Sequence, residues 1–344
     1  MRRRTWISLV IALAVLGALA VALYLRAKAP PEAARLLPES DAIIYINLKP
    51  LRAATHFDQT PVIRSADLQH FINATGIVPE RDLDAAALAL HRMPNPHGPN
   101  GPVAYSEVFV GHFDGQRLAH YLASIASSQE NYAGQTIYTI PVEGRKLRVA
   151  QIAFDMVAAS NMPTPEQIHS IVDRSRASAV SSPGSSLLAA RFHDVPLLSQ
   201  AWGIGRIGLP FAQNGRITFL GLQLPVTAES DLVASLRWVP LRGGTADLRI
   251  EEFAGDALDA EHTVNALNAL LSFVRGLASA EPPRGPADAA MRQIIDSATL
   301  QHKGDRAILH ASATLDQLKA ILSAHNPSAA ATQPETSSDS EASK

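Results

Sequence analysis

The chain has 344 residues, no cysteine and a formal net charge of −2 at pH 7. Without cysteine it can form neither disulfides nor a cysteine-ligated zinc site, nor can it carry a lipid on a cysteine. Basic residues gather in the first 35 positions and the remainder is mildly acidic, which argues against nucleic-acid binding because that function needs a basic stripe.

The N-terminus carries an uninterrupted apolar run at 5–25, between Arg2–Arg4 and the basic residues Arg26 and Lys28. At 1.5 Å per residue a helix of this length spans about 30 Å, the thickness of a bilayer core. The sequence therefore predicts a transmembrane helix at 5–25 after a cytoplasmic segment at 1–4. The excess of positive charge before the run predicts a bacterial inner-membrane protein with its C-terminal body in the periplasm.

Two alternatives stay open for this run. A cleaved secretory signal would need a small-x-small site, and Ala27-Lys28-Ala29 supplies one only directly before Pro30. A buried core helix is the other alternative, because no charge interrupts the segment. Cleavage therefore cannot be decided from the residues.

The regions that follow differ in composition. Residues 26–35 are rich in alanine and proline and predict a semi-rigid linker. Residues 326–344 lack large apolar side chains and predict a disordered tail. The body between them divides at a Ser/Pro/Gly-rich stretch into a first half at 36–180 and a second half at 181–325.

The first half alternates apolar runs with short helical patterns. Strands are predicted at 41–48, 107–113, 136–142, 146–153 and 154–159, while 83–91 fits a strand or a helix. Helices are predicted at 67–75, 114–125 and 164–176. Asp114 is expected to cap the middle helix. Its apolar stripe has the spacing i, i+3, i+4, i+7: Leu118, Tyr121, Leu122 and Ile125.

The second half repeats this style of pattern. Strands are predicted at 216–224, 232–238, 246–250, 298–302 and 306–313, and helices at 197–202, 259–279, 287–297 and 314–324. Both halves end in a hairpin followed by a helix with a Thr-x-x-Gln start. We expect an α+β fold of antiparallel sheets with packed amphipathic helices, in two similar halves behind the transmembrane helix.

No motif in the chain predicts catalysis. The run from Gly203 to Gly208 matches Gly-x-Gly-x-x-Gly, but Leu209-Pro210 follows where a dinucleotide site needs a helix. The twelve histidines lack metal-ligand spacing, and the serine cluster near 181–186 lacks a nucleophile elbow. We therefore expect no catalytic residue, no metal and no cofactor.

One apolar loop is a candidate interaction patch. Five large side chains crowd between its glycines: Trp202, Ile204, Ile207, Leu209 and Phe211. If exposed, they would bind a partner or a lipid; the pattern favours the alternative, in which they pack beneath the sheet as core.

The chain resembles a family of uncharacterised bacterial envelope proteins with membrane anchors. The resemblance rests on Leu37-Pro38-x-x-Asp41-Ala42, on Tyr132-x-Gly134-x-x-Ile137-Tyr138, and on Ala158-Ala159-Ser160 running into a helix that starts at Thr164. It covers the first half of the body. The resemblance implies an anchored periplasmic protein and provides no catalytic residues.

Three functions remain open at this point. The first is a non-catalytic binding or accessory factor of the envelope, which has a protein partner there. The second is a module that binds a lipid or another small molecule. The third is a hydrolase whose catalytic residues lie far apart in the sequence. Substrate, partner, pathway and oligomeric state do not follow from the residues.

Overall fold

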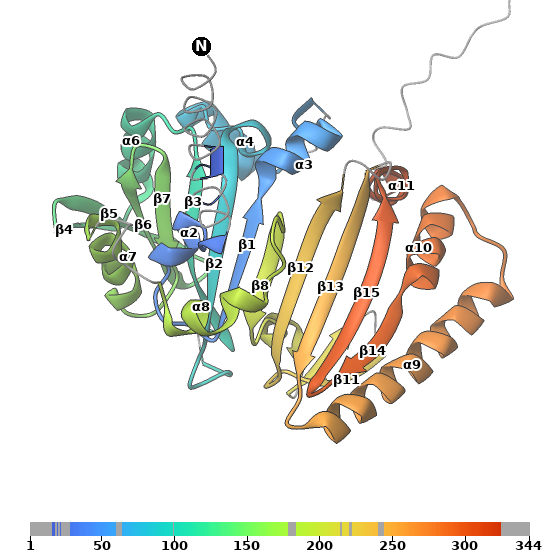
Figure 1. Cartoon of the computed structure of the whole chain (residues 1–344). Coiled ribbons are helices and arrows are strands. Elements are labelled where there is room, and N and C mark those ends of the chain that lie inside the picture. Colours follow the sequence, from blue (N-terminus) through green and yellow to red (C-terminus); the bar gives the residue numbers. More distant parts are fainter. Residues whose placement is uncertain are drawn as a thin grey trace, which may run out of the picture.

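The computed structural model describes residues 16, 17, 19, 21, 28–59, 64–98, 100–177, 184–213, 215–219, 222–239 and 244–324. The protein is α+β, with one antiparallel sheet of twelve strands running through both halves (Figure 1). Its strand order is β14-β15-β13-β12-β8-β1-β2-β3-β7-β6-β5-β4, and a separate sheet has the order β11-β10-β9. The predicted antiparallel pairing is thus present throughout.

The first half contributes seven strands. They are β1 (Ala42–Asn47), β2 (Leu83–Arg92), β3 (Val103–Gly111), β4 (Ser128–Tyr132), β5 (Gln135–Val142), β6 (Arg145–Ala153) and β7 (Met156–Ser160). Its helices are α2 (Glu32–Leu36), α3 (Leu48–Thr55), α4 (Ala66–Thr75), α5 (Pro79–Asp82), α6 (Gly115–Ile125) and α7 (Glu166–Arg176).

The second half contributes the remaining strands and helices. The strands are β8 (Ala201–Gly205), β9 (Ala212–Gln213), β10 (Arg216–Phe219), β11 (Leu222–Thr227), β12 (Asp231–Val239), β13 (Thr245–Phe253), β14 (Thr299–Lys303) and β15 (Arg306–Thr314). The helices are α8 (Ser186–Arg191), α9 (Ala257–Ala280), α10 (Pro286–Ser297) and α11 (Leu315–Ala324).

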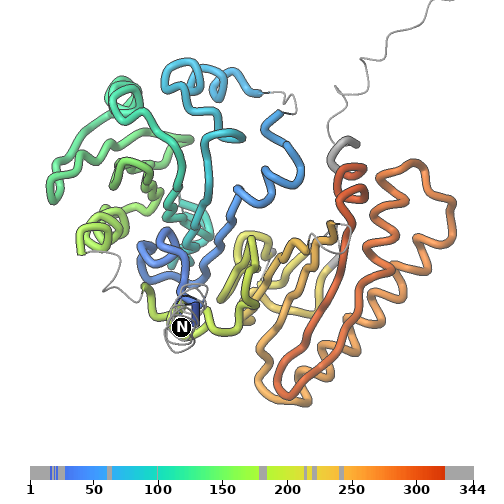
Figure 2. Tube along the Cα trace, turned by 45° about the horizontal axis from the view of Figure 1, so that its top comes forward, coloured from blue at the N-terminus to red at the C-terminus, as the bar shows by residue number. Residues whose placement is uncertain are grey.

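The two halves arrange their strands in the same order. In the first, β1, β2 and β3 are neighbours, a helix follows, and β7 returns to pair with β3. In the second, β8, β12 and β13 are neighbours, α9 and α10 follow, and β15 returns to pair with β13. The leading strands β1 and β8 pair with each other, with Tyr45 opposite Trp202, so the halves lie side by side (Figure 2).

The two faces of the sheet have separate cores in the first half. Because side chains alternate along a strand, Ala158 and Ala159 of β7 point to opposite faces. Ala158 packs in the main core with Ile168 and Ile171 of α7, and this is the α7 face. Ala159 packs in a second core with Leu118 of α6, and this is the α6 face.

In the second half a helix packs on the α6 face. Leu267 of α9 contacts Leu232 of β12 together with Ile217 and Val226 of the small sheet. Val233, the next residue of β12, belongs to the main core on the α7 face. The helix α9 therefore lies on the same side of the sheet as α6.

The predicted fold class needs a correction at the N-terminus. Among the described residues, no helix combines the length and the hydropathy that a membrane span requires. This finding contradicts the transmembrane part of the prediction and the membrane class assigned with it. Most of 5–25 lies outside the described residues, as does the tail at 326–344. The location predicted from the flanking arginines stays a prediction.

Most predicted elements of the body are present, with shifted ends. The segment 83–91, which fitted either a strand or a helix, forms most of the strand β2. The helix predicted at 197–202 is wrong, because residues 197–200 are not helical and residues 201–205 form β8. The last helix begins with the expected reciprocal cap, in which Gln317 N donates to Thr314 Oγ1 (3.3 Å) and Thr314 N donates to Gln317 Oε1 (2.7 Å).

Candidate binding site

The five residues of the candidate patch do not form one exposed surface. Trp202 and Ile204 lie on β8 and are buried in the main core. Leu209 is buried in a smaller cluster, against which Ile207 packs half-buried. Phe211 alone of the five is exposed, at 66%. Most of the patch is therefore core, which was the alternative interpretation.

The glycines of this segment allow neighbouring atoms to approach the main chain closely. Gly205 has φ +86°, and a Cβ there would lie 2.4 Å from the carbonyl oxygen of Asp41. A Cβ on Gly208 would lie 2.4 Å from Ile217 Cδ1. After β8 comes the short 3-10 helix Leu209–Phe211, which is too short to direct amides at a pyrophosphate. The glycine spacing therefore reflects tight strand packing.

A cavity of about 390 Å³ lies on the α6 face of the first half, between the sheet and the helices α4 and α6. We call it the α6 cavity. Its lining comes from both helices, from the segments that precede β2 and α6, and from five strands. The lining residues are Phe71, Ile77, Pro79, Leu83, Glu107, Phe109, Phe113, Leu118, Tyr121, Leu122, Ile125, Ile140, Val142, Leu147, Val149, Val157 and Ala159.

Local sequence signals position the two helices over the cavity. Asp114 Oδ1 caps α6 by accepting from the amides of Gln116 and Arg117, each at 3.1 Å, as predicted. The helix α4 ends at Gly76, whose φ of +77° favours glycine. Arg117 then donates to the carbonyls of Ala74 (3.1 Å) and Asn73 (2.9 Å), placing a positive charge at the C-terminal end of α4.

Aromatic and aliphatic side chains form the inner surface of the cavity. The rings of Phe71 and Tyr121 meet edge to face at 5.4 Å and join α4 to α6. Leu118 and Leu122 of the predicted stripe are buried, at 4% and 5% exposure. Ile125 and Val142 are more than one third exposed and mark where the cavity meets solvent. Apolar surface is thus continuous from the inside to the rim.

Glu107 is the one carboxylate in this lining. It lies on β3 in a row across the α6 face, opposite Leu88 of β2 and Ala159 of β7. In the part of the chain that the structure describes, its carboxyl has no hydrogen-bond or ion-pair partner. Burial raises the pKa of Glu107 above its usual value, because desolvation disfavours the charged form.

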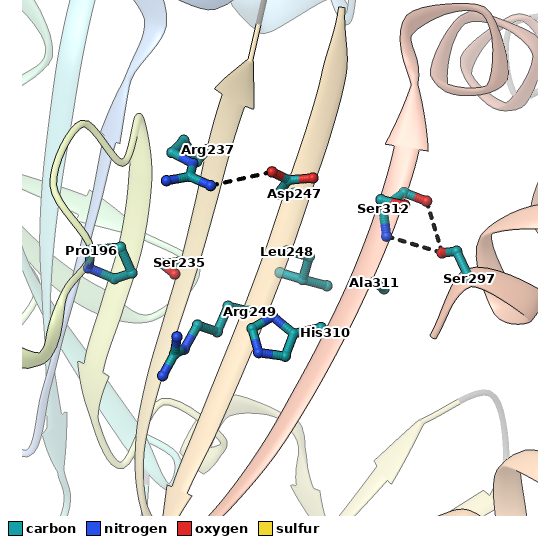
Figure 3. Close-up of a pocket in the computed structure, with 10 residues that line it drawn as sticks. All are labelled: Pro196, Ser235, Arg237, Asp247, Leu248, Arg249, Ser297, His310, Ala311 and Ser312. Carbon is teal, nitrogen blue, oxygen red and sulfur yellow. Dashed lines mark hydrogen bonds and ion pairs between the residues drawn. The ribbon is translucent and has the colours of Figure 1, made fainter. Parts of the chain in front are cut away.

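A second hollow, of about 320 Å³, lies on the α7 face of the second half (Figure 3). Most residues of its lining are polar or charged, in contrast to the α6 cavity. Arg237 and Asp247 stand opposite each other on β12 and β13 and pair at 3.4 Å. Ser297 of α10 bonds to the main chain of Ser312, accepting from its amide at 3.0 Å and donating to its carbonyl at 2.9 Å.

The charges around this polar hollow compensate one another. Arg249 pairs with Glu251 at 2.7 Å, and Arg306 pairs with both Glu251 (3.2 Å) and Asp194 (2.9 Å). Burial, and then the positive charge of Arg249, lower the pKa of His310. Figure 3 shows no hydrogen bond between His310 and the serines drawn there. The hollow thus has neither an unpaired charge for an ion nor a serine activated by a base.

Acidic residues elsewhere in the chain have structural roles. Asp84 pairs with Lys49 at 2.9 Å and with Arg52 at 3.4 Å. Asp256 caps α9 by accepting from the amide of Asp259 at 2.8 Å. Within the described ranges, no group of three or more His, Asp or Glu residues is arranged to hold a metal ion.

No residue pattern predicted the α6 cavity or the position of Glu107 in it. Glu107 appeared only as the start of a predicted strand, and β3 begins earlier, at Val103. A buried acid at an inward position of a strand could have signalled the site, but only if the strand bounds had been known.

Comparisons with known proteins add little to this geometry. No protein-family model matches the chain, and no curated protein matches it. The chain is similar to two crystal structures of TP0453 at 12% identity. Crystal form III has a TM-score of 0.46 over 86% of this chain and 99% of that chain; crystal form I has 0.41 over 86% and 98%. The resemblance to envelope proteins stays a prediction.

Proposed function

We propose that this protein is a non-catalytic binding protein whose first half takes up an apolar small molecule in the α6 cavity. The observation that carries the proposal is the chemistry of the lining. Apart from Glu107 and the hydroxyl of Tyr121, every lining residue is apolar. Ligand pockets of about 300–1,000 Å³ with mostly apolar walls and few polar groups are typical of small-molecule sites.

The volume of the cavity supports the proposal. The α6 cavity opens to solvent at its rim, where Ile125 and Val142 are exposed. A space of about 390 Å³ corresponds to roughly a dozen waters at ~30 Å³ each. Water needs two to four polar partners to sit well in a cavity, and these walls offer almost none. An apolar ligand would displace such water favourably.

The test is binding of an uncharged apolar fluorophore, N-phenyl-1-naphthylamine, to the purified full chain. Ala159 lies on the cavity floor and is buried, so Ala159→Phe should fill the space and weaken binding at least tenfold. Ala123→Phe makes the same change on the exposed side of α6 and should leave binding unchanged. Far-ultraviolet circular dichroism checks that both variants are folded.

Ala159→Leu provides a milder second variant, with an intermediate loss expected. If the fluorophore does not bind to the folded wild-type chain, or if both phenylalanine variants bind it equally, the cavity is not a ligand site. A polar substrate finds less support, because the charged side chains around the polar hollow pair with one another.

A further inference from the structure

Glu107 is half-buried, and in the part of the chain that the structure describes it differs from the most deeply buried acids in having no partner. Glu251 and Asp194, both 5% exposed or less, share the guanidinium of Arg306. Glu252 accepts from Ser230 Oγ at 2.9 Å. The Glu107 carboxyl lies among Leu88, Ala159 and the other apolar walls, and no described residue donates to it.

The carboxyl of Glu107 becomes costly once a ligand covers it. An acceptor that loses its water without gaining another hydrogen bond costs more than the bond contributes when it is made. The lining offers no basic residue that could approach the carboxyl. Because no lining side chain donates to Glu107 in this structure, a ligand that displaces water from the carboxyl would have to supply a donor itself.

We infer that the ligand of the α6 cavity is an apolar molecule bearing a hydroxyl group, that this hydroxyl donates a hydrogen bond to the Glu107 carboxyl, and that ionised carboxylic acids are excluded. The inference rests on the proposed function. Both protonation states of a carboxyl can accept from an alcohol. A carboxylate ligand would instead place a second negative charge beside Glu107, and like charges in an apolar site repel strongly.

Glu107 is thus a residue that determines specificity, while the apolar walls provide most of the affinity. A hydrocarbon of the same length should bind through the walls but leave Glu107 unsatisfied. An alcohol should bind more tightly than that hydrocarbon by about tenfold, as expected for one buried hydrogen bond. The ionised acid of the same length should be the weakest of the three.

The experiment uses the full chain and three probes of equal length: dodecanol, dodecane and dodecanoate. Each displaces N-phenyl-1-naphthylamine at pH 8, where dodecanoate is ionised, and the order expected is alcohol, then hydrocarbon, then acid. Glu107→Leu should abolish the preference for the alcohol over the hydrocarbon. Glu107→Gln keeps an acceptor oxygen, so the variant should still bind dodecanol. Its amide nitrogen can also donate to a carboxylate, so the variant should bind dodecanoate as well.

The possible failures are distinguishable. If the fluorophore binds and all three probes displace it equally, the inference about Glu107 is overturned and the proposed function stands. The same holds if Glu107→Leu keeps the selectivity of the wild type. If neither the fluorophore nor any probe binds, the proposed function fails and this inference fails with it.

Discussion

The two halves of the sheet share a strand order but differ in what lies on their faces. In the first half, helices cover both faces, with α2 and α7 on one and α4 and α6 on the other. In the second half, the α7 face has Arg237 and Arg249, whose side chains are 48% and 37% exposed. The same strand order thus occurs in a half whose sheet has helices on both faces and in a half whose α7 face carries exposed charged side chains.

One row of side chains on the α7 face shows where the change occurs. From β2 to β15 the opposed residues of this row are Ala87, Tyr45, Trp202, Ser235, Arg249 and His310. The row is apolar as far as β8 and polar from β12 onward. The helices that cover this face therefore end where the side chains of the row stop being apolar, and the α6 cavity lies in the covered half.

The largest expected effect is the loss of apolar contacts in the covered half. Ile171 of α7 is fully buried in the main core, so Ile171→Ala should lower the unfolding free energy by about 2–5 kcal/mol. Ile250 of β13 is only half-buried, and Ile250→Ala should cost less than half as much. Denaturant unfolding measures both. Equal losses would mean that the halves are equally well packed.

A smaller effect is expected from the ion pairs of the open half. Arg306→Met leaves Asp194 and Glu251 short of a partner, and both are almost fully buried. Because Arg306 is one third exposed and Arg249 still contacts Glu251, the loss should be about 2 kcal/mol, below the 3–5 kcal/mol of fully buried pairs. Arg237→Met, which breaks an exposed pair, should cost under about 1 kcal/mol. Similar losses in denaturant unfolding would refute this ranking.

Removing a helix cap should have a modest effect on stability in either half but affect binding in only one. Asp114→Ala and Asp256→Ala each remove an N-cap and should cost about 1 kcal/mol. Only Asp114 caps a helix over the α6 cavity, so only its variant should weaken fluorophore binding. If Asp256→Ala weakens binding equally, the effect is not local to the cavity.

The smallest effect concerns the pH dependence of stability. Because the pKa of Glu107 is raised in the folded protein, the folded state keeps its proton to higher pH than the unfolded state does. The unfolding free energy should therefore fall as pH rises from about 4.3, the usual glutamate pKa, through the folded pKa. Glu107→Gln should reduce this fall. If the unfolding free energies of the variant and the wild type change with pH in the same way, this prediction is wrong.

Local pattern predicted most of the elements, because their signals lie within the elements themselves. Alternation marked β13 through Ala246, Leu248 and Ile250, and the cap at Asp114 marked α6. The strand β8 was missed because Gly203 and Gly205 lower strand propensity, and only the close approach of β1 shows why glycine is needed. The α6 cavity was missed because its walls come from segments that only long-range pairing brings together.

The central pairing of β1 with β8 has a consequence for synthesis. Tyr45 meets Trp202 across this pair, so β1 keeps one open edge until the chain beyond residue 205 has left the ribosome. At about 5–20 residues per second this delay lasts roughly 10–30 s. An unpaired apolar strand edge is a template for association with another chain. The nascent protein is thus most vulnerable to aggregation between the synthesis of β1 and the arrival of β8.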